Sequence, residues 1–554
     1  MSTSFADYLR LYRQSWLRLQ QKTPQLLPYE DRALYSTWNI SLDHVKQQSE
    51  LATKLLRLWA YFDNQDVWLE LVQAGRKGSP AWFLELTEDQ ISFDAAVRVL
   101  CGHALVEADA ASKADSVESH GYSMHSCVHA WTKHVVNKRR NNKMARLVLR
   151  CVGLHVPSKN ALQYWVTQQR LLRHANRCQG SMDAVLAGKE DDTTTMDAVH
   201  GLGDLYWNQE RLDEAEEMYK RSLQGREKAL GCNHRLTLQT VNNLGNLYRK
   251  QGKLNKAEEM YERALQGKEK ALGRDHTSTL STVNNLGLLY KDKSKLSKAE
   301  EMFEWALQGR EKALGRDHTS TLSTVNNLGI LYADQGKLDE AEEMYERALQ
   351  GYDKVLGRDH TLTLGTVNNL GSLYIDKGKL GKAEGMFEWA LQGYEKALGR
   401  DHTSTLSTVN NLGVLYKYQG KLDEAEEMYK RSLQGREKAL GCNHRSTLDT
   451  VNNLGNLYQK QGKLNKAEEM YERVLQGNEK ALGRDHTSTL STIKNLGNLY
   501  QKQGKLDKAE EMYKQALKGY EKRFGSDHRR CRSLRRALAL IQDRVVSQSV
   551  VTRT

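Results

Sequence analysis

The stretch "TVNNLGNLYRKQGKLNKAEEMYERALQGKEKALGRDHTSTLS", residues 240–281, decides the fold of this 554-residue chain. Close copies follow one another with a strict offset of 42 residues, so the glycine of the Leu-Gly pair falls at Gly203, Gly245, Gly287, Gly329, Gly371, Gly413, Gly455 and Gly497. A fixed period of roughly 20 to 50 residues is typical of solenoids, in which each unit buries its apolar side against its neighbours. We therefore predict eight stacked units.

Within one unit the apolar residues follow two helical stripes. Val241, Leu244 and Tyr248 have the i, i+3, i+7 spacing of one helix face and predict a first helix, which we call helix A. After a short turn, Ala257 and Tyr261 lie on a second stripe, which predicts helix B. Each unit is therefore expected to be a pair of antiparallel helices.

The ends of helix B carry stop signals and one unexplained residue. Gly273 stands where a left-handed helix stop is expected, and the following segment "RDHTST", residues 274–279, carries Thr and Ser residues able to cap the next helix A. The recurring "RDH" is itself most simply a helix cap. Gly267 lies inside helix B at a cost of about 1 kcal/mol, and the sequence offers no reason for it.

The pattern L-G-x-x-Y, with Ala twelve residues after the glycine, Tyr four later and Ala three later, resembles the tetratricopeptide repeat. The period exceeds the roughly 34 residues of the usual unit, no proline closes helix B, and the extended "ALQGxEKALGxDH" tail is similar to the kinesin-light-chain class of these repeats. The resemblance implies an all-α fold, a right-handed superhelix of about eight helix-turn-helix units over residues 196–530. Residues 531–554 are expected to form a capping helix and tail.

The copies differ most at the helix A positions one and four after the glycine, while "AEEMY" in helix B is largely kept. In the resembled family this side of helix A lines a concave groove that receives a peptide, and the alternative for its variation is neutral drift at exposed sites. The paired asparagines beside it offer donors and acceptors suited to the backbone of an extended peptide, although hydrogen bonds between adjacent helices are the alternative. The candidate groove residues are Asn242, Asn243, Asn246, Arg249, Asn284, Asn285, Leu288, Lys291, Asn326, Asn327, Ile330, Ala333, Asn368, Asn369, Ser372, Ile375, Asn410, Asn411, Val414, Lys417, Asn452, Asn453, Asn456 and Gln459.

The character of these residues predicts the kind of ligand. The middle units carry an apolar set, flanked by three basic residues, so we expect an extended segment with apolar anchors and some acidic character. The apolar set is expected to lie off the buried stripe, so that polar replacements would spare folding. The apolar residues are Leu288, Ile330, Ile375 and Val414, and the basic ones are Arg249, Lys291 and Lys417.

The first two hundred residues lack the period and are richer in tryptophan. Three helical segments precede the stretches "ALVEAD" and "GYSMHSCVH", which could form a hairpin, and this order is a winged-helix pattern. It resembles the winged-helix region of fungal STAND-type proteins, in which an NB-ARC or NACHT module is joined to tetratricopeptide repeats. The resemblance implies a remnant helix of that module at residues 1–27, a winged-helix-like domain at 28–136 and a helical connector at 137–195.

Members of that family sense ADP through a Met-His pair, which Met124 and His125 match. This chain has no GxxxxGK[ST] phosphate loop, however, and the nearest wording, "AGRKGS" at residues 74–79, lacks the spacing that lets backbone N–H groups hold phosphates. We therefore expect no nucleotide cofactor and interpret His125 as an ordinary residue of the domain, with nucleotide sensing the weaker alternative. The chain would be a truncated gene, a standalone adaptor or a partner of an NTPase-bearing chain.

Composition excludes several other classes. The net charge of +13 is spread over alternating Lys, Arg and Glu, which is typical of solvated helix faces and makes nucleic-acid binding a weak expectation. Seven dispersed cysteines include no CxxC pair, so neither a metal site nor a disulfide framework is expected. No apolar run is long enough for a membrane helix, and the start does not resemble a secretory signal.

These observations predict a cytoplasmic protein-interaction scaffold without enzymatic activity, whose groove binds an extended peptide or partner protein. The resemblance makes it the sensing arm of a fungal STAND-type recognition or signalling protein. The alternatives are a cargo adaptor like kinesin light chain, which heptads before the repeats would favour, and an ATP- or ADP-dependent switch.

Overall fold

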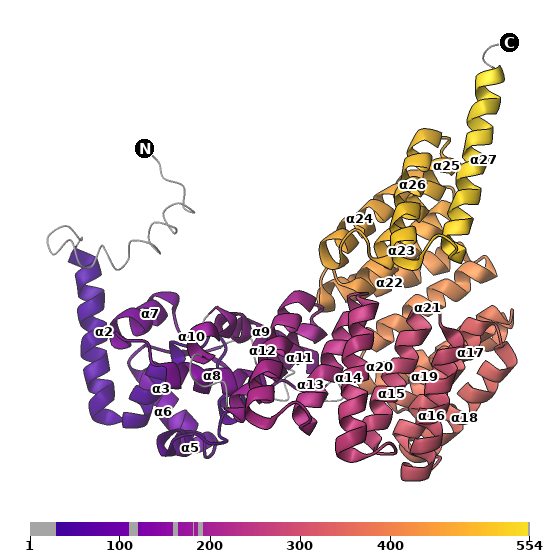
Figure 1. The fold of residues 1–554 in the computed structure, drawn as a ribbon. Coiled ribbons are helices and arrows are strands. Elements are labelled where there is room, and N and C mark those ends of the chain that lie inside the picture. The colour runs from indigo at the N-terminus through magenta and orange to yellow at the C-terminus, as the bar shows by residue number, and fades with distance from the viewer. Residues whose placement is uncertain (1–28, 110–119, 159–163, 181, 187–191, 552–554) are drawn as a thin grey trace. The chain divides into compact units, whose positions relative to one another are not determined.

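The computed structural model describes residues 29–109, 120–158, 164–180, 182–186 and 192–551 (Figure 1). Contacts divide the chain into two units, residues 1–202 and 203–554, which we describe separately. The remnant helix predicted at residues 1–27 lies outside the described residues. Among those that are described, no helix combines the length and the apolar character that a membrane crossing requires.

The first unit consists of short helices and one small hairpin. Its helices are α2 (Tyr29–Gln48), α3 (Glu50–Trp59), α4 (Leu69–Gln73), α5 (Ala81–Leu86), α6 (Gln90–Gly102), α7 (Ser126–Trp131), the π-helix η2 (Thr132–Val136), α8 (Asn142–Leu154), α9 (Tyr164–Gln179) and α10 (Met182–Leu186). Strands β1 (Glu107–Ala108) and β2 (Tyr122–Ser123) pair antiparallel, with Glu107 opposite Ser123. Val67 forms a bridge to Tyr122 on the other side of β2. The first unit is therefore a helical domain with a small sheet, to which β1, β2 and the bridge residue Val67 contribute.

Fully buried tryptophans centre the core of this unit. Trp59, Trp68 and Trp131 are all inaccessible to solvent. The Arg170 guanidinium lies 3.8 Å from the centre of the Trp68 ring and also pairs with Asp66 at 2.8 Å. Because Arg170 belongs to α9, this stacking joins α9 to the loop before α4. The helices of the segment predicted as a connector thus pack on the same core.

The second unit is an array of alternating helices A and B, with α11 beginning before the unit boundary (Figure 1). Helices A are α11 (Thr193–Asn208), α13 (Arg235–Lys250), α15 (Thr277–Asp292), α17 (Thr319–Gln335), α19 (Thr361–Asp376), α21 (Thr403–Gln419), α23 (Arg445–Lys460) and α25 (Thr487–Lys502). Helices B are α12 (Leu212–Leu230), α14 (Leu254–Leu272), α16 (Leu296–Leu314), α18 (Leu338–Leu356), α20 (Leu380–Leu398), α22 (Leu422–Leu440), α24 (Leu464–Leu482) and α26 (Leu506–Phe524). The terminal helix α27 (Arg529–Val551) follows, and the predicted all-α solenoid is confirmed.

Two glycines per unit let the helices of a pair approach closely. A Cβ on Gly245 would lie 2.6 Å from the Tyr261 ring, which explains the glycine of the Leu-Gly pair. A Cβ on Gly267 would lie 2.4 Å from a methyl group of Leu238 in helix A of the same unit. The unexplained glycine of helix B therefore creates space for the helix A leucine, and this packing offsets its low helix propensity.

The loops between units differ from the sequence prediction in two details. Gly273 has φ of 95° and ψ of 162°, a conformation that only glycine adopts readily but that is extended rather than left-handed helical. The cap of the next helix A is His276, whose Nδ1 accepts from the Ser278 N–H at 3.1 Å. The hydroxyl of Thr279 instead donates to the Gly273 carbonyl at 2.8 Å. Thr or Ser therefore does not cap helix A as predicted, whereas the prediction that "RDH" caps the helix is confirmed, through its histidine.

The contacts also define the curvature of the array. Helices B from α14 to α24 each pack between two helices A, yet consecutive helices A such as α13 and α15 also contact each other directly. Consecutive helices B make fewer contacts or none among the described residues. A stack that is closer on one side curves toward that side, so helices A line the inner face.

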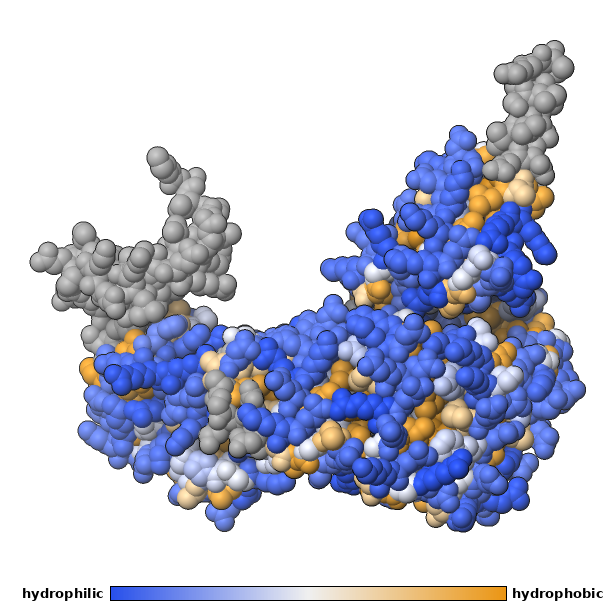
Figure 2. Space-filling model, in the orientation of Figure 1, coloured by the Kyte–Doolittle hydropathy of each residue, from blue (hydrophilic) through white to orange (hydrophobic). Residues whose placement is uncertain are grey.

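On the face seen in Figure 2, hydrophilic residues cover most of the surface and apolar ones gather in smaller patches.

Candidate functional site

The paired asparagines form a ladder along the inner face. In each step the second asparagine of one helix A donates from Nδ2 to Oδ1 of the first asparagine in the preceding helix A. The donor–acceptor pairs are Asn285–Asn242 at 3.2 Å, Asn327–Asn284 at 3.1 Å, Asn369–Asn326 at 3.0 Å, Asn411–Asn368 at 3.2 Å, Asn453–Asn410 at 3.1 Å and Asn495–Asn452 at 3.1 Å. Hydrogen bonding between helices, the alternative left open by the sequence, is therefore present.

The ladder uses only half of each carboxamide. The first asparagine of a pair, such as Asn326, accepts through Oδ1, and its NH₂ group has no partner among the described residues. The second asparagine, such as Asn327, donates through Nδ2, and its own oxygen has none. Most of these side chains are partly exposed, although Asn284 is buried. A row of donors and acceptors thus remains on the inner face.

The position after the Leu-Gly glycine contacts the aromatic residue of helix B. Where this position holds Asn or Asp, it accepts a hydrogen bond from the tyrosine hydroxyl of the same unit, as for Asn246 and Tyr261 at 2.6 Å. The other such pairs are Asp204–Tyr219 at 2.5 Å, Asn456–Tyr471 at 2.7 Å and Asn498–Tyr513 at 2.7 Å. Variation at this position therefore has a structural component, which pattern reading missed.

Units that hold other residues at this position either have phenylalanine in place of the helix B tyrosine or leave the tyrosine hydroxyl without this acceptor. Units with Leu288 and Ser372 have phenylalanine in helix B, Phe303 and Phe387, which needs no acceptor. The unit with Val414 keeps Tyr429, whose buried hydroxyl has no hydrogen-bond partner. The Tyr429 hydroxyl is thus an unsatisfied polar atom beside the candidate groove, as is Nε2 of the groove candidate Gln459.

The apolar groove candidates are more buried than the sequence suggested. Ile330 and Ile375 are half-buried and pack against the core cluster around Tyr345 and Phe387. Val414 packs in the same way against the cluster around Tyr429. The expectation that these three residues lie off the buried stripe is wrong, because their stripe borders the core, and polar replacements would cost stability as well as alter the surface.

Two of the three basic candidates have acidic partners in the next unit. Arg249 pairs with Asp292 at 3.4 Å, and Lys291 pairs with Asp334 at 3.1 Å. Lys417 has no carboxylate partner among the described residues. Burial lowers the pKa of Lys417, and the charge of Lys460 lowers it further. The unneutralised positive charge of the groove therefore lies at α21 and α23 rather than at both sides of the apolar set.

Acidic residues lie between these regions. Burial raises the pKa of Asp376, and the neighbouring charge of Asp334 adds to the effect. The remaining groove candidates are partly exposed: Asn246, Ala333 and Asn456 border the core, while Gln459 lies one helical turn beyond Asn456. The inner face thus changes from paired charges through an acidic centre to a basic end.

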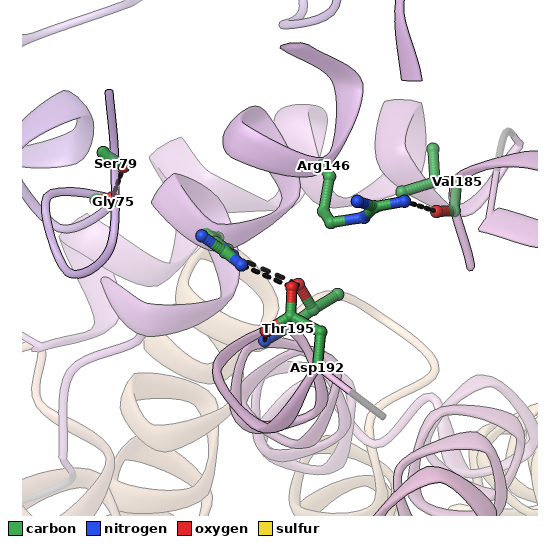
Figure 3. A network of polar contacts seen from close by, with 7 residues as sticks. Gly75, Ser79, Arg146, Val185, Asp192 and Thr195 are labelled. Carbon is green, nitrogen blue, oxygen red and sulfur yellow. Dashed lines mark hydrogen bonds and ion pairs between the residues drawn. The ribbon is translucent and has the colours of Figure 1, made fainter. Parts of the chain in front are cut away.

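The residues considered for nucleotide binding have local structural roles. His125 is exposed, and its Nδ1 accepts from the Cys127 N–H at 3.3 Å to cap α7. In the "AGRKGS" segment the N–H groups of Gly75 and Ser79 bond to preceding carbonyls. The Ser79 hydroxyl donates to the Gly75 carbonyl at 2.6 Å (Figure 3). These backbone groups are therefore not presented to a phosphate.

Neighbouring polar contacts fix the helices around this segment. Arg150 on α8 donates to Thr195 at 3.1 Å and pairs with Asp192. Arg146 on the same helix donates to the Val185 carbonyl at 3.0 Å, as the side chains in Figure 3 show. These bonds join α8 to the segments before and after residues 187–191, which supports a structural role for both arginines.

Repeated helix pairs with an inner face of helices A define a helical-repeat protein of the protein-binding class. The tetratricopeptide repeat model matches residues 194–270, 241–312, 280–354, 320–396, 362–438, 404–480, 446–522 and 488–544. These segments together span more than half of the chain, which belongs to the tetratricopeptide-repeat family.

Solved structures similar to the chain include repeat proteins of several sources. Nearly identical repeats from Podosopora anserina, named for kinesin light chain, share 27% identity over 37% of this chain and 97% of theirs, with a TM-score of 0.32. BtubC from P. vanneervenii shares 24% identity over 42% of this chain and 92% of its own, with a TM-score of 0.34. The STAND protein PH0952 from Pyrococcus horikoshii shares 15% identity over 94% of this chain and 70% of its own, with a TM-score of 0.42. No curated protein sequence matches significantly.

Proposed function

We propose that the inner face of helices A binds an extended peptide segment of a partner protein. The observation that carries this proposal is the row of half-used asparagines, in which ladder residues such as Asn326 and Asn327 each keep a donor or an acceptor without a partner among the described residues. An extended peptide backbone offers the complementary groups at regular intervals. The chain would act as an interaction scaffold.

The charges refine the expected ligand. Because Arg249 and Lys291 are neutralised by aspartates, acidic residues of the ligand would lie at the Lys417 end. Its apolar anchors would contact Ile330, Ile375 and Val414, whose exposed parts border the core. Basic ligand residues would be favoured near Asp376, which forms no ion pair among the described residues, whereas Asp334 is paired with Lys291.

For the biological setting we infer the sensing arm of a fungal STAND-type protein, acting as an adaptor or together with an NTPase-bearing chain. The order of helices, hairpin and repeats supports this setting, with a winged-helix-like region at residues 28–136 and a helical segment at 137–195. Cargo binding in the manner of kinesin light chain is the alternative for the repeats. The bonded backbone of the "AGRKGS" segment argues against an ATP-dependent switch within the described part of the chain.

The test is a peptide-library selection on the full chain with two kinds of variant. Asn326→Asp keeps the oxygen that serves the ladder and removes the free NH₂ group, so it should weaken many ligands alike. Gln350→Glu adds the same charge on the exposed side of helix B in the same unit and serves as the control. Val414→Asn should change the ranking of ligands, because it removes an apolar anchor, while its carboxamide can accept from the Tyr429 hydroxyl as Asn456 accepts from Tyr471.

Thermal melts of each variant separate folding from binding. Selection of no peptide by the wild-type chain would refute groove binding. An unchanged ranking for Val414→Asn, with normal melting, would refute recognition by the variable positions.

A further inference from the structure

The turn between helix A and helix B of the first repeat holds an unexpected residue. In every unit the residue two places before helix B has a positive φ. It is glycine in most units, at Gly252, Gly336, Gly378, Gly420, Gly462 and Gly504. The first unit has Glu210 there, with φ of 56°, and the third has Ser294. Because this conformation favours glycine, a glutamate is strained unless another contact holds it in place.

The Glu210 carboxylate makes a contact with a distant unit. One of its oxygens accepts from the Arg445 N–H at 2.9 Å and lies 3.4 Å from Nε2 of His444, while the other pairs with Lys250 at 2.8 Å. Arg445 is the first residue of α23, helix A of the seventh unit. N–H groups at the start of a helix have no carbonyl partner within it and favour an anion. Glu210 thus joins the first unit to the seventh.

A second contact of this kind lies one repeat further along the array. Gly252 and His486 are the equivalents of Glu210 and His444, and a Cβ on Gly252 would lie 3.1 Å from the His486 ring. The guanidinium of Arg523, at the end of α26, donates to the Gly252 carbonyl. The array therefore contacts itself after six units, at two successive steps.

The loop histidines that cap helices A differ in exposure accordingly. Those of the early units are exposed, namely His234, His276, His318 and His360. The side chain of His444 is only 10% exposed, and His486 is buried. Because each of these histidines caps its own helix in the same way, the difference comes from the turns of the first two units, which cover the later loops.

The contacts that close the array are few and polar. Adjacent helices of the array pack along their length, whereas no described helix of the first two units packs extensively on one of the last two. Separating them leaves the packing between adjacent units intact. Glu210 would also keep Lys250, its partner from the adjacent unit, so its charge would not be left unpaired. The array can therefore exchange between closed and open forms.

We propose that Glu210 is a latch that closes one superhelical turn of the array and controls access to its inner face. A coil whose successive turns touch has no opening between them, so a ligand can enter only along the axis. An extended segment with a free end can enter the closed form, whereas a segment flanked by folded domains requires the open one. The purpose of the latch rests on the peptide binding proposed above.

Glu210→Gly tests the latch, because it removes the carboxylate and gives the turn the residue that most units have there. Hydrogen exchange of the Arg445 amide in the full chain measures closure. It should be about tenfold faster in this variant, since a hydrogen bond to a charged group is worth roughly tenfold or more. Ser294→Gly is the matched control, because Ser294 has φ of 58°, is exposed and forms no hydrogen bond with a distant unit among the described residues.

Access to the inner face is measured without any peptide, through a thiol introduced by Ser372→Cys at an exposed position of α19. A polyethylene-glycol maleimide should label this thiol about tenfold faster when Glu210→Gly is also present, because the open fraction rises by that factor. Iodoacetamide is small enough to enter both forms and should react equally. Peptide mapping separates this thiol from the native cysteines. Arg523→Gln, which removes the second contact, should also speed labelling by the polymer.

Thermal melts should show no loss of folding in Glu210→Gly, and Arg523→Gln provides a second variant with an unchanged first turn. Unchanged exchange at Arg445, or equal labelling by the polymer with and without Glu210→Gly, would overturn the proposal. Faster labelling in Ser294→Gly would do so as well, because the effect would then come from the turn backbone. Labelling that responds as expected in a chain that selects no peptide would support the latch and refute the peptide binding.

Discussion

Residues 212–235 and 422–445 have the same sequence, yet they stand in the first and the sixth unit. The two copies form the same hydrogen bonds with the unit that follows each of them. The carboxylate of Glu216 accepts from Tyr248 and Gln251, and the equivalent Glu426 accepts from the equivalent tyrosine and glutamine. Contacts in this direction are therefore specified by the repeat sequence itself.

The two copies differ in their polar contacts with the residues that precede them. Tyr219 donates to Asp204 at 2.5 Å, whereas Tyr429 faces Val414 and has no partner for its hydroxyl. Arg431 pairs with Glu395 of the preceding helix B, while the equivalent Arg221 pairs with Glu217 in its own helix. One sequence thus gives one backbone but different polar contacts, depending on its neighbours.

The largest expected effect tests what the copies share. Tyr219→Ala and Tyr429→Ala should each destabilise the array by about 3 to 5 kcal/mol, because both rings pack on the glycine of their own helix A. Chemical denaturation of the full chain measures both losses. A small loss at either position would show that ring packing is not set by the repeat.

A second comparison concerns the loop histidines, of which His276 is exposed and His486 is buried. Burial lowers the pKa of His486 to about 4, with further contributions from Arg523 and Arg445. Because the folded pKa is below the unfolded value of about 6.5, the unfolded state binds the proton more readily. Stability should be complete above pH 6.5 and fall by up to about 3 kcal/mol as the pH approaches 4.

The variant His486→Asn isolates this effect. Asparagine can still cap α25 as an acceptor but does not titrate. Denaturation midpoints measured from pH 7 to pH 4 should therefore fall less steeply than those of the wild type. Parallel curves would show that other groups cause the acid sensitivity.

A smaller effect tests where the copies differ. Tyr219→Phe should cost about 1 to 3 kcal/mol, because it leaves the partly buried Asp204 without this donor. Tyr429→Phe should be neutral or slightly stabilising, because its hydroxyl is already unsatisfied. Equal losses in denaturation experiments would mean that Tyr429 has an unseen partner.

The smallest effect concerns the two arginines. Arg221→Ala and Arg431→Ala remove partly exposed ion pairs, which are typically worth about 0.2 to 1 kcal/mol. Both losses should shrink when denaturation is repeated at high salt. A salt-independent loss for Arg431→Ala would indicate that its packing, rather than its charge, joins the units.

The sequence predicted features that repeat and depend on nearby residues. The period, the two helices and the small residue beneath Tyr261 follow from patterns within 42 residues. The role of Gly267 did not, because its contact with Leu238 depends on the crossing of two helices. Of the two capping predictions, the one for "RDH" was right and the one for Ser and Thr was wrong: these are the usual capping residues, but here His276 takes that place.

The site was harder to predict than the fold. Candidate groove residues were found by comparing copies, but the pairing of Arg249 with Asp292 joins residues of different units and changes the expected ligand charge. The exposure of Ile375 was overestimated because this residue lies at the border between groove and core, where side chains are partly buried. A cavity of the first unit was also invisible to pattern reading, because its lining residues Tyr61, Lys133 and Arg177 come together only in the folded chain.

The asparagine ladder has a consequence for how the gene can change. Each bond joins residues 43 positions apart, one repeat plus one residue. Deleting or duplicating an exact unit would therefore bring an equivalent donor and acceptor together at the new junction, without leaving a mismatched amide. Recombination between copies could lengthen or shorten the inner face while every intermediate remains foldable, so such a lineage could explore ligands of different length by unequal crossing-over alone.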